Sequence, residues 1–355
     1  MDPRARLAAS EVVVPCHNLE QTLAFFVDRL GFRIETIFPA DAPEVAVISG
    51  PGSRLRLIRG EGPSPTIRLL YDNTPPEIDL LTPPEDIHVE LASVSTPMEL
   101  PALEPSFQVS RYKNAVWSEG RASMRYRDLI PGRQGGLFIA SHIHIAKGGS
   151  VPDYTHFHNI EFQMIFCHKG WVSVIYEDQG DAFVMLPGDC VLQPPQIRHR
   201  VLECSPNLEV IELGCPALHE TWADYELTLP TQRIDPQRLF SGQRFVRHVA
   251  QQAHWDAWLA EGFEFRDTGI SKATGALASV EVIRCTSPTN QPVQLRHNER
   301  LSFYFLLRGS ARLHDTETDT ETCFSENDSW VTAPRRCYQL EHCSPDFEIL
   351  RVTVH

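Results

Sequence analysis

The sequence predicts a mainly β protein in which a small α+β module precedes two tandem copies of one β domain. Three observations carry this prediction. Residues recur at a fixed spacing over most of the chain, both copies contain short segments of alternating polarity, and the first 72 residues instead follow the order βαβββ. We therefore expect a module at 1–72, a linker at 73–106, a first copy at 107–230 and a second copy at 231–355.

The N-terminal module is predicted from one helical segment among several strands. Segment 11–16 has the composition of a strand, and Asn18 can cap a helix whose apolar stripe includes Leu23 and Phe26. Gly31 ends that helix. Strands are expected at 32–38, 45–49, 54–59 and 66–71, which gives βαβββ with one further strand.

The predicted linker is rich in proline, with Pro-Pro pairs at 75–76 and 83–84. Proline lacks a backbone donor and interrupts regular structure, so most of residues 73–106 should be irregular. Segment 87–92 is a candidate strand within it, and the sequence does not identify a partner for that strand.

The two copies are evident when the chain is compared with itself. Matching residues recur 139 positions apart without insertions. The clearest pairs are His158 with His297, Gly170 with Gly309, Asp189 with Asp328 and Cys204 with Cys343. Each copy has many short alternating segments separated by turns, which is typical of a sandwich or barrel. The expected helical content is small, with one helix at 248–259.

Composition argues against several classes of partner. The 355-residue chain has a formal net charge of −14, whereas nucleic acids and anionic membranes bind basic surfaces. No apolar run has the length of a membrane span, and the first residues lack the apolar core of a signal peptide. Nine cysteines without a Cys-x-x-Cys pair suggest reduced thiols, which are typical of a cytoplasmic protein. With nucleic acids and membranes disfavoured as partners, we expect the protein to act on a small molecule.

Three histidines in the first copy indicate a metal site. His156 and His158 are two residues apart on an expected strand, so both imidazoles should point to one face. His199 follows a turn and a hydrophobic run that can return a neighbouring strand to the same point. Three neutral imidazoles with one oxygen donor suit a divalent transition metal. Gln163 is the candidate oxygen donor, with a water molecule in that position as the alternative.

Four further residues are candidates for substrate contact or proton transfer. Glu161 has the strand parity of Gln163, so it could replace that ligand, act as a general base, or be solvated at the barrel mouth. Tyr154 has the parity of His156 and could line the pocket. His142 and His144 share one strand face, which we expect to point inward as substrate contacts, while Ile143 and Ile145 pack outside. If that face points outward, the two histidines are surface residues. Independently of that strand, His168 lies beside a turn and should be exposed.

The repeat unit resembles the cupin family, and the chain as a whole resembles a bicupin with an N-terminal extension. The family's two motifs are matched by His156, His158, Gln163 and Gly170, and by Gly188, Pro194 and His199. Gln163 stands where the family usually has Glu, and Gln196 and Glu203 replace the second motif's inner Gly and final Asn. The resemblance covers 107–355 and implies two double-stranded β-helix barrels, with the metal inside the barrel.

The second copy has lost most of the ligand set. At the 139-residue offset, Leu295, Ser302 and Tyr338 replace His156, Gln163 and His199, and His297 alone persists. One imidazole cannot hold a metal, so we expect the second barrel to be structural. One active and one degenerate copy resembles several bicupin ring-cleaving dioxygenases.

Segment 10–72 resembles one module of the vicinal oxygen chelate, or glyoxalase-like, family. Members usually pair two modules to build a metal cup, and the sequence shows one, so a non-catalytic role is expected. Its unpaired sheet edge could pack on the cupins or on a second chain, which makes a homodimer possible.

These resemblances lead to a first hypothesis: an oxygen-dependent dioxygenase acting on a small phenolic, diketone or enol substrate. His156, His158 and His199 would bind Fe(II), Gln163 would complete the shell, and Glu161 would move the substrate proton. A redox-neutral lyase or isomerase using Mn, Ni or Zn is one alternative. A small-molecule binding or sensor protein without catalysis is the other.

Overall fold

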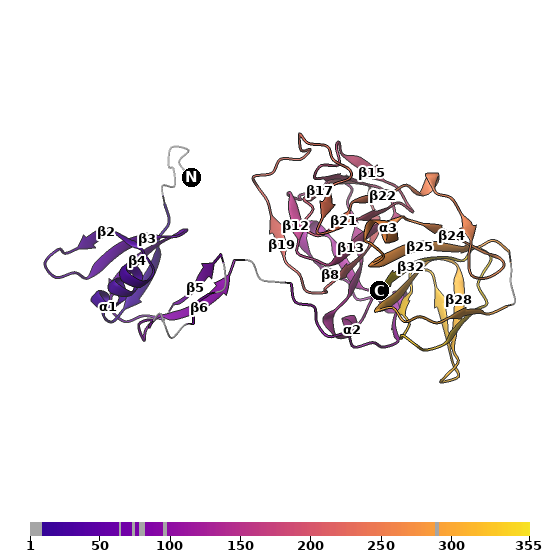
Figure 1. Ribbon diagram of the computed structural model, residues 1–355, viewed down its shortest axis with the longest axis horizontal. Helices are drawn as coiled ribbons and strands as arrows, with labels where there is room; N and C mark the ends of the chain where they lie inside the picture. The colour runs from indigo at the N-terminus through magenta and orange to yellow at the C-terminus, as the bar shows by residue number, and fades with distance from the viewer. Residues whose placement is uncertain (1–8, 64, 73–74, 78–81, 95–97, 288–290) are drawn as a thin grey trace. The chain divides into compact units, whose positions relative to one another are not determined.

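The computed structural model describes residues 9–63, 65–72, 75–77, 82–94, 98–287 and 291–355 (Figure 1). The chain forms two compact units, Met1–Pro97 and Met98–His355. Residues 1–8, where the expected absence of a signal peptide falls, lie outside the described ranges. Every described helix is too short or too polar to cross a membrane.

The first unit contains the predicted βαβββ order. Its elements are β1 (Val12–Cys16), α1 (Leu19–Ala24), η1 (Phe25–Arg29), β2 (Arg33–Phe38), β3 (Val45–Gly50) and β4 (Ser53–Arg59). The sheet order is β1-β4-β3-β2, with β1 parallel to β4. The Asn18 side chain accepts a hydrogen bond from the backbone N of Gln21 at 3.1 Å, as expected of an N-cap. Phe26 and Leu57 are fully buried between helix and sheet.

The proline-rich segment contains a paired strand. β6 (His88–Ser93) pairs in parallel with β5 (Thr66–Tyr71), and these two strands form a sheet of their own. The structure therefore identifies the partner that the sequence did not, and the first compact unit extends through most of the predicted linker to Pro97. Residues 73–74, 78–81 and 95–97 of that segment lie outside the described ranges.

The first barrel is built from two antiparallel sheets. Its strands are β8 (Ser118–Glu119), β9 (Arg125–Asp128), β10 (Ile139–Ile145), β11 (Gly149–Ser150), β12 (His156–His158), β13 (Phe162–Lys169), β14 (Val172–Tyr176), β15 (Phe183–Met185), β16 (Cys190–Leu192), β17 (His199–Cys204), β18 (Leu208–Cys215) and β19 (Thr221–Ala223). One sheet has the order β22-β16-β13-β18-β10-β9-β8 and the other the order β15-β14-β17-β12-β19. The short helices η3 (Tyr112–Asn114), η4 (Arg121–Ser123) and α2 (Arg133–Gly136) lie in its connections.

The second barrel repeats this arrangement. Before it in sequence, β20 (Leu239–Phe240) and β21 (Gln243–Arg244) form a separate two-stranded sheet, and Phe240 packs into the core of the first barrel. The elements of the second barrel are β23 (Asp256–Ala257), β24 (Phe263–Asp267), α3 (Ile270–Ala273), β25 (Ala278–Cys285), β26 (Val293–Leu295), β27 (Leu301–Arg308), β28 (Ser310–Asp315), β29 (Thr320–Ser325), β30 (Ser329–Val331), β31 (Tyr338–Glu341) and β32 (Glu348–Val354). Its main sheets have the orders β23-β24-β25-β32-β27-β30-β7 and β26-β31-β28-β29. The mainly β fold class of two tandem barrels preceded by an α+β module is thereby confirmed.

The two barrels exchange strands. β7 (Gln108–Ser110) precedes the first barrel in sequence and pairs with β30 of the second, while β22 (Val246–His248) pairs with β16 of the first. Two buried arginines reinforce the exchange: Arg127 donates to the carbonyl of Asn327 at 2.6 Å, and Arg266 donates to that of Gly188 at 3.1 Å. One core cluster contains side chains from both barrels. The duplicated halves are therefore interlocked within the second unit.

The prediction of a helix at 248–259 is wrong. The segment contains the end of β22, one turn of 3-10 helix η5 (Ala250–Gln252) and β23. The backbone N of Ala250 donates to the Asp189 carboxylate at 2.8 Å, and Trp258 donates to the carbonyl of Phe263 at 3.0 Å. Pairing of β22 with β16 and of β23 with β24 thus overrides the local helical preference.

Candidate metal centre

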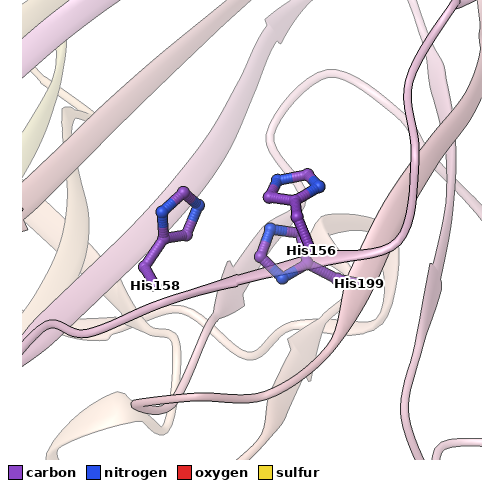
Figure 2. A group of neighbouring side chains, drawn as sticks. All are labelled: His156, His158 and His199. Atoms are coloured by element: carbon purple, nitrogen blue, oxygen red, sulfur yellow. The ribbon is translucent and has the colours of Figure 1, made fainter. Parts of the chain in front are cut away.

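His156, His158 and His199 converge in the first barrel (Figure 2). The alternation of β12 turns His156 and His158 to the same side, and antiparallel pairing with β17 puts His199 opposite His156. One ring nitrogen from each residue lies within 4.8 Å of those of the other two. The ring centroids of His156 and His199 are 4.3 Å apart. All three side chains are buried.

The three rings are oriented by acceptors on the protein. His156 Nδ1 donates to the carbonyl of Tyr154 at 2.8 Å, and His199 Nδ1 donates to that of Ile197 at 3.0 Å. The Nδ1 of His158 lies 3.1 Å from the Thr221 hydroxyl. A carbonyl oxygen only accepts, so the proton of His156 and of His199 resides on Nδ1. Their Nε2 lone pairs are left for another partner.

The three imidazoles are neutral at physiological pH. Burial lowers the pKa of His156, and the nearby Arg121 guanidinium lowers it further. Burial, together with the neighbouring His156 and His219, lowers the pKa of His158 to about 3. Burial, together with the neighbouring His156 and His158, holds the pKa of His199 well below its ordinary value. Neutral imidazole is the form that ligates a metal.

A small cavity adjoins the three histidines, with a volume of about 100 Å³. Both sheets of the first barrel contribute to its lining, which is largely apolar. Besides the histidines, its polar lining includes Arg121, Tyr126, Gln163, Tyr176, Gln193 and Glu212. The size and lining suit a small ligand with few polar groups.

Gln163 and Glu212 form a hydrogen-bonded pair in this lining. Gln163 lies on β13 and is 2% exposed, and its Nε2 donates to Glu212 Oε1 at 2.5 Å. Glu212 lies on the neighbouring strand β18. Sequence reasoning missed Glu212. The signal that could have found it is a carboxylate with the parity of Leu208 and Val210 on an otherwise apolar strand face.

Arg121 also lies at the cavity and was not predicted. One guanidinium nitrogen is 2.9 Å from His156 Nε2, and another donates to the Asp153 carboxylate. Asp153 is buried and also accepts from the backbone N of Val201 at 2.9 Å. Arg121 lies in η4, far from both histidine motifs in sequence, so motif spacing carries no signal for it.

Glu161 is positioned differently from the prediction. β13 begins at Phe162, so the strand alternation that relates Glu161 to Gln163 does not extend to it. Its carboxylate pairs with Arg300 of the second barrel at 3.0 Å and accepts from the Cys215 thiol at 3.2 Å. Glu161 therefore lies outside the cavity lining, where neither the ligand role nor the general-base role has geometric support.

Tyr154 supports the site without lining the cavity. Its side chain is 37% exposed, and its ring packs edge-on against His156 at 5.8 Å and beside Tyr225 at 5.9 Å. Its carbonyl, rather than its phenol, orients His156.

The inward orientation expected for His142 and His144 is wrong, because Ile143 and Ile145 line the cavity instead. His142 is fully buried on the other face of β10, with Nε2 2.9 Å from the Glu209 carboxylate and its ring 5.6 Å from Phe305 of the second barrel. His144 packs edge-on near Trp117 on that same outer face. Both faces of β10 are covered, so alternation alone could not tell them apart.

His168 is buried, against the expectation of exposure. Its Nε2 lies 2.8 Å from the Asn327 side-chain oxygen of the second barrel, and its ring contacts those of His142 and Phe305. His142, His168, Glu209 and Asn327 thus form a polar cluster between the barrels.

The corresponding interior of the second barrel is filled by side chains. Tyr338, in the place of His199, is fully buried and stacks on Phe107 at 5.6 Å. His297 Nε2 donates a hydrogen bond to the carbonyl of Thr332 at 3.0 Å, so this nitrogen carries a proton and offers no lone pair to a metal. Within the described ranges, His156, His158 and His199 form the one group of three or more His, Cys, Asp or Glu residues with ligand atoms this close.

Comparison with known proteins defines the fold. No protein-family model matches the sequence, and no curated protein does. Solved structures do match. Protein Ylba from E. coli has a TM-score of 0.53 and 10% identity, over 73% of this chain and 95% of its own. A mutant of Bacillus subtilis oxalate decarboxylase OxdC has a TM-score of 0.53 and 10% identity, over 79% and 84%.

Salicylate 1,2-dioxygenase from Pseudoaminobacter salicylatoxidans, studied as adducts with gentisate, is a third structural relative. It has a TM-score of 0.51 and 16% identity, over 73% of this chain and 83% of its own. With the two interlocked barrels, these likenesses establish the bicupin fold. The likeness of the N-terminal unit to the glyoxalase-like family stays a prediction.

Proposed function

We propose that this bicupin is a metal-dependent enzyme whose first barrel holds one divalent transition metal through His156, His158 and His199. The observation that carries the proposal is the convergence of three buried, neutral imidazoles within 4.8 Å beside a cavity. Three such imidazoles with an amide oxygen suit Fe(II), and also accept Mn, Ni or Zn. Fe(II) is the ion we favour, with Gln163 as the fourth protein ligand.

The residues present fit a metal ion. Carbonyl acceptors hold the Nδ1 of His156 and His199, and the Thr221 hydroxyl contacts that of His158, which is how metal-ligating histidines are usually fixed. Arg121 is the group that contacts His156 Nε2, so a metal ligated there requires its guanidinium to turn aside. The Arg121 side chain is 37% exposed and anchored through a different nitrogen by Asp153, which leaves it room to do so.

The reaction we propose is an oxygen-dependent dioxygenation of a small phenolic, diketone or enol substrate. Fe(II) held by His156, His158 and His199 would supply the chemistry by which such a substrate reacts with O₂. The fold shared with a salicylate dioxygenase supports this reaction class. The largely apolar walls and the small volume of the cavity suit a small substrate.

Three residues of this chain would orient the substrate and the ligands. Arg121, held by Asp153, presents donors to an anionic phenolate, enolate or carboxylate oxygen. Tyr176 stacks on His199 with centroids 5.6 Å apart and fixes the plane of that ring. No proton-transfer role is assigned to Glu161, since its carboxylate is engaged by Arg300.

A redox-neutral lyase or isomerase is the second candidate, and Gln163 favours it. An amide in the place of a carboxylate ligand leaves the full divalent charge on the metal. That charge strengthens activation of a carbonyl or enediol oxygen without O₂.

One experiment separates these functions. Purified protein is loaded separately with Fe(II), Mn, Ni and Zn and its metal content measured. Turnover is then followed with and without O₂ on salicylate, gentisate, oxalate and a simple diketone. We expect oxygen uptake by the iron form, with ¹⁸O from O₂ in the product, and its loss in His199→Ala but not in the matched His297→Ala.

Other outcomes decide against the dioxygenase. Turnover that persists without O₂ supports the lyase or isomerase. A saturable ligand without any product by mass spectrometry supports a binding protein. Failure of every metal to bind stoichiometrically removes the metal-centred proposal itself.

A further inference from the structure

Gln163 and Glu212 bring an amide and a carboxylate together beside the three histidines. The two residues lie on adjacent antiparallel strands, β13 and β18, and both line the same cavity. Gln163 is almost completely buried, and its Nε2 lies 2.5 Å from Glu212 Oε1. A short hydrogen bond between an amide and a carboxylate holds both groups in a defined arrangement.

This contact determines which end of the Gln163 amide points away from Glu212. An ionised carboxylate only accepts hydrogen bonds, so the amide group that faces it must be the NH₂. The carbonyl oxygen of Gln163 is then directed to the opposite side. An NH₂ group has no lone pair for a cation, whereas an amide oxygen does, so this orientation decides whether Gln163 can ligate a metal at all.

Glu212 itself does not belong to the group of close ligand atoms. That group contains His156, His158 and His199, and the carboxylate of Glu212 lies beyond it. Glu212 would therefore act on an ion held there through its contact with Gln163 and through its charge, and not as a ligand.

The second barrel provides an internal comparison. At the 139-residue offset, Ser302 and Arg351 replace Gln163 and Glu212. Arg351 pairs with Glu281 at 3.4 Å, and Ser302 donates to the Tyr304 hydroxyl at 3.0 Å. The amide–carboxylate pair thus occurs in the barrel that has the three histidines and is replaced in the barrel that lacks them.

We propose that Glu212 is a positioning residue of the metal centre, which turns the Gln163 carbonyl oxygen toward the three imidazoles so that this amide acts as the fourth ligand. The pair also keeps a negative charge one residue away from the metal, without occupying a coordination position. This inference rests on the proposed function, because it requires a metal at His156, His158 and His199.

The test measures metal binding rather than activity. Co²⁺ is titrated into the metal-free full-length protein. Affinity is obtained by competition with a chromophoric chelator, and coordination geometry from the visible d–d bands. In Glu212→Met the acceptor is removed while the chain length is kept, so the amide loses its fixed orientation. We expect Co²⁺ affinity to fall by about 10–100-fold, as for other partners of metal ligands, and the d–d bands to change.

A swapped pair provides the rescue. In the double variant Gln163→Glu with Glu212→Gln, residue 163 becomes a carboxylate ligand and residue 212 becomes its amide donor. The hydrogen bond is thereby rebuilt with its direction reversed. We expect this variant to bind Co²⁺ at least as tightly as the wild type. Glu203→Gln, at an exposed position on β17, is the matched control and should leave affinity and spectrum unchanged.

Each outcome bears on the proposal. Wild-type affinity and spectrum in Glu212→Met would overturn it, as would a folded swap that binds no better than Glu212→Met. If Glu212→Met does not fold by circular dichroism, Glu212→Gln takes its place. The amide oxygen introduced by this variant can still accept a hydrogen bond from Gln163, but it carries no charge. An intermediate loss of Co²⁺ affinity would support the proposal, and an unchanged affinity would contradict it. Failure of the wild type to bind Co²⁺ would instead refute the proposed function.

Discussion

The polar cluster between the barrels predicts a specific dependence of stability on pH. Burial lowers the pKa of His168 to about 4, although the Asn327 side chain partly opposes this shift. An unfolded histidine has a pKa of about 6.5. The unfolded state therefore binds a proton before the folded state does, and the stability that neutral His168 contributes is present above about pH 6.5 and lost as the pH falls toward 4.

The magnitude follows from these two pKa values. Lowering the pH from 8 to 5 favours protonation of His168 about 30-fold more in the unfolded state than in the folded state. The free energy of unfolding should therefore fall by about 2 kcal/mol. In His168→Gln the amide can still bond to Asn327 but does not titrate. The wild type should therefore lose about 2 kcal/mol more than the variant between pH 8 and pH 5.

Urea unfolding of the metal-free protein at several pH values measures this difference. All six tryptophans belong to the second compact unit, so their fluorescence reports that unit alone. If the free energy of unfolding has the same dependence on pH in wild type and His168→Gln, the reasoning is refuted. That result would mean that His168 has the same pKa in the folded protein as in water.

Three other predictions concern the site. Glu161→Gln should change kcat by less than about threefold, since the carboxylate pairs with Arg300 outside the cavity, and a hundredfold loss in steady-state assays would restore its catalytic role. Metal at 100-fold over its Kd should add about 2.7 kcal/mol to the unfolding free energy of wild type and His297→Ala but nothing to His199→Ala, as measured by urea denaturation. Ile143→Ala should lower the free energy of unfolding by about 2–5 kcal/mol and enlarge the cavity. His144→Ala, on the outer face of β10, should leave the KM for substrate unchanged.

Much of this architecture could be predicted from the sequence because a duplication leaves a constant offset. That offset predicts two barrels, and strand alternation with motif spacing predicts that His156, His158 and His199 converge, as the structure confirms. These features depend on local periodicity and on pairing between strands that are close in the fold's topology.

The errors have a common physical origin in contacts between the barrels. His142 and Ile143 both belong to a strand that is covered on both faces, so polarity did not reveal which face lines the cavity. His168 meets Asn327 of the second barrel, which helps to bury it. In segment 248–259, His248 pairs with β16 of the first barrel and β23 pairs with β24, so no helix forms there. A single sequence contains no direct signal for such long-range partners.

The residues that complete the site were missed for a different reason. Arg121 and Glu212 lie outside both cupin motifs, and each enters the cavity from an element whose position depends on the closed barrel. Glu161 lies one residue before β13, which begins at Phe162, so the alternation expected from the sequence does not apply to it.

The central claim is that one cation binds in the first barrel and none in the second. Anomalous diffraction from crystals of the protein loaded with Co²⁺ tests it most directly. The account predicts one strong peak per chain, within bonding distance of His156, His158 and His199. A peak beside His297, or full-occupancy cobalt bound away from all three histidines, would contradict it.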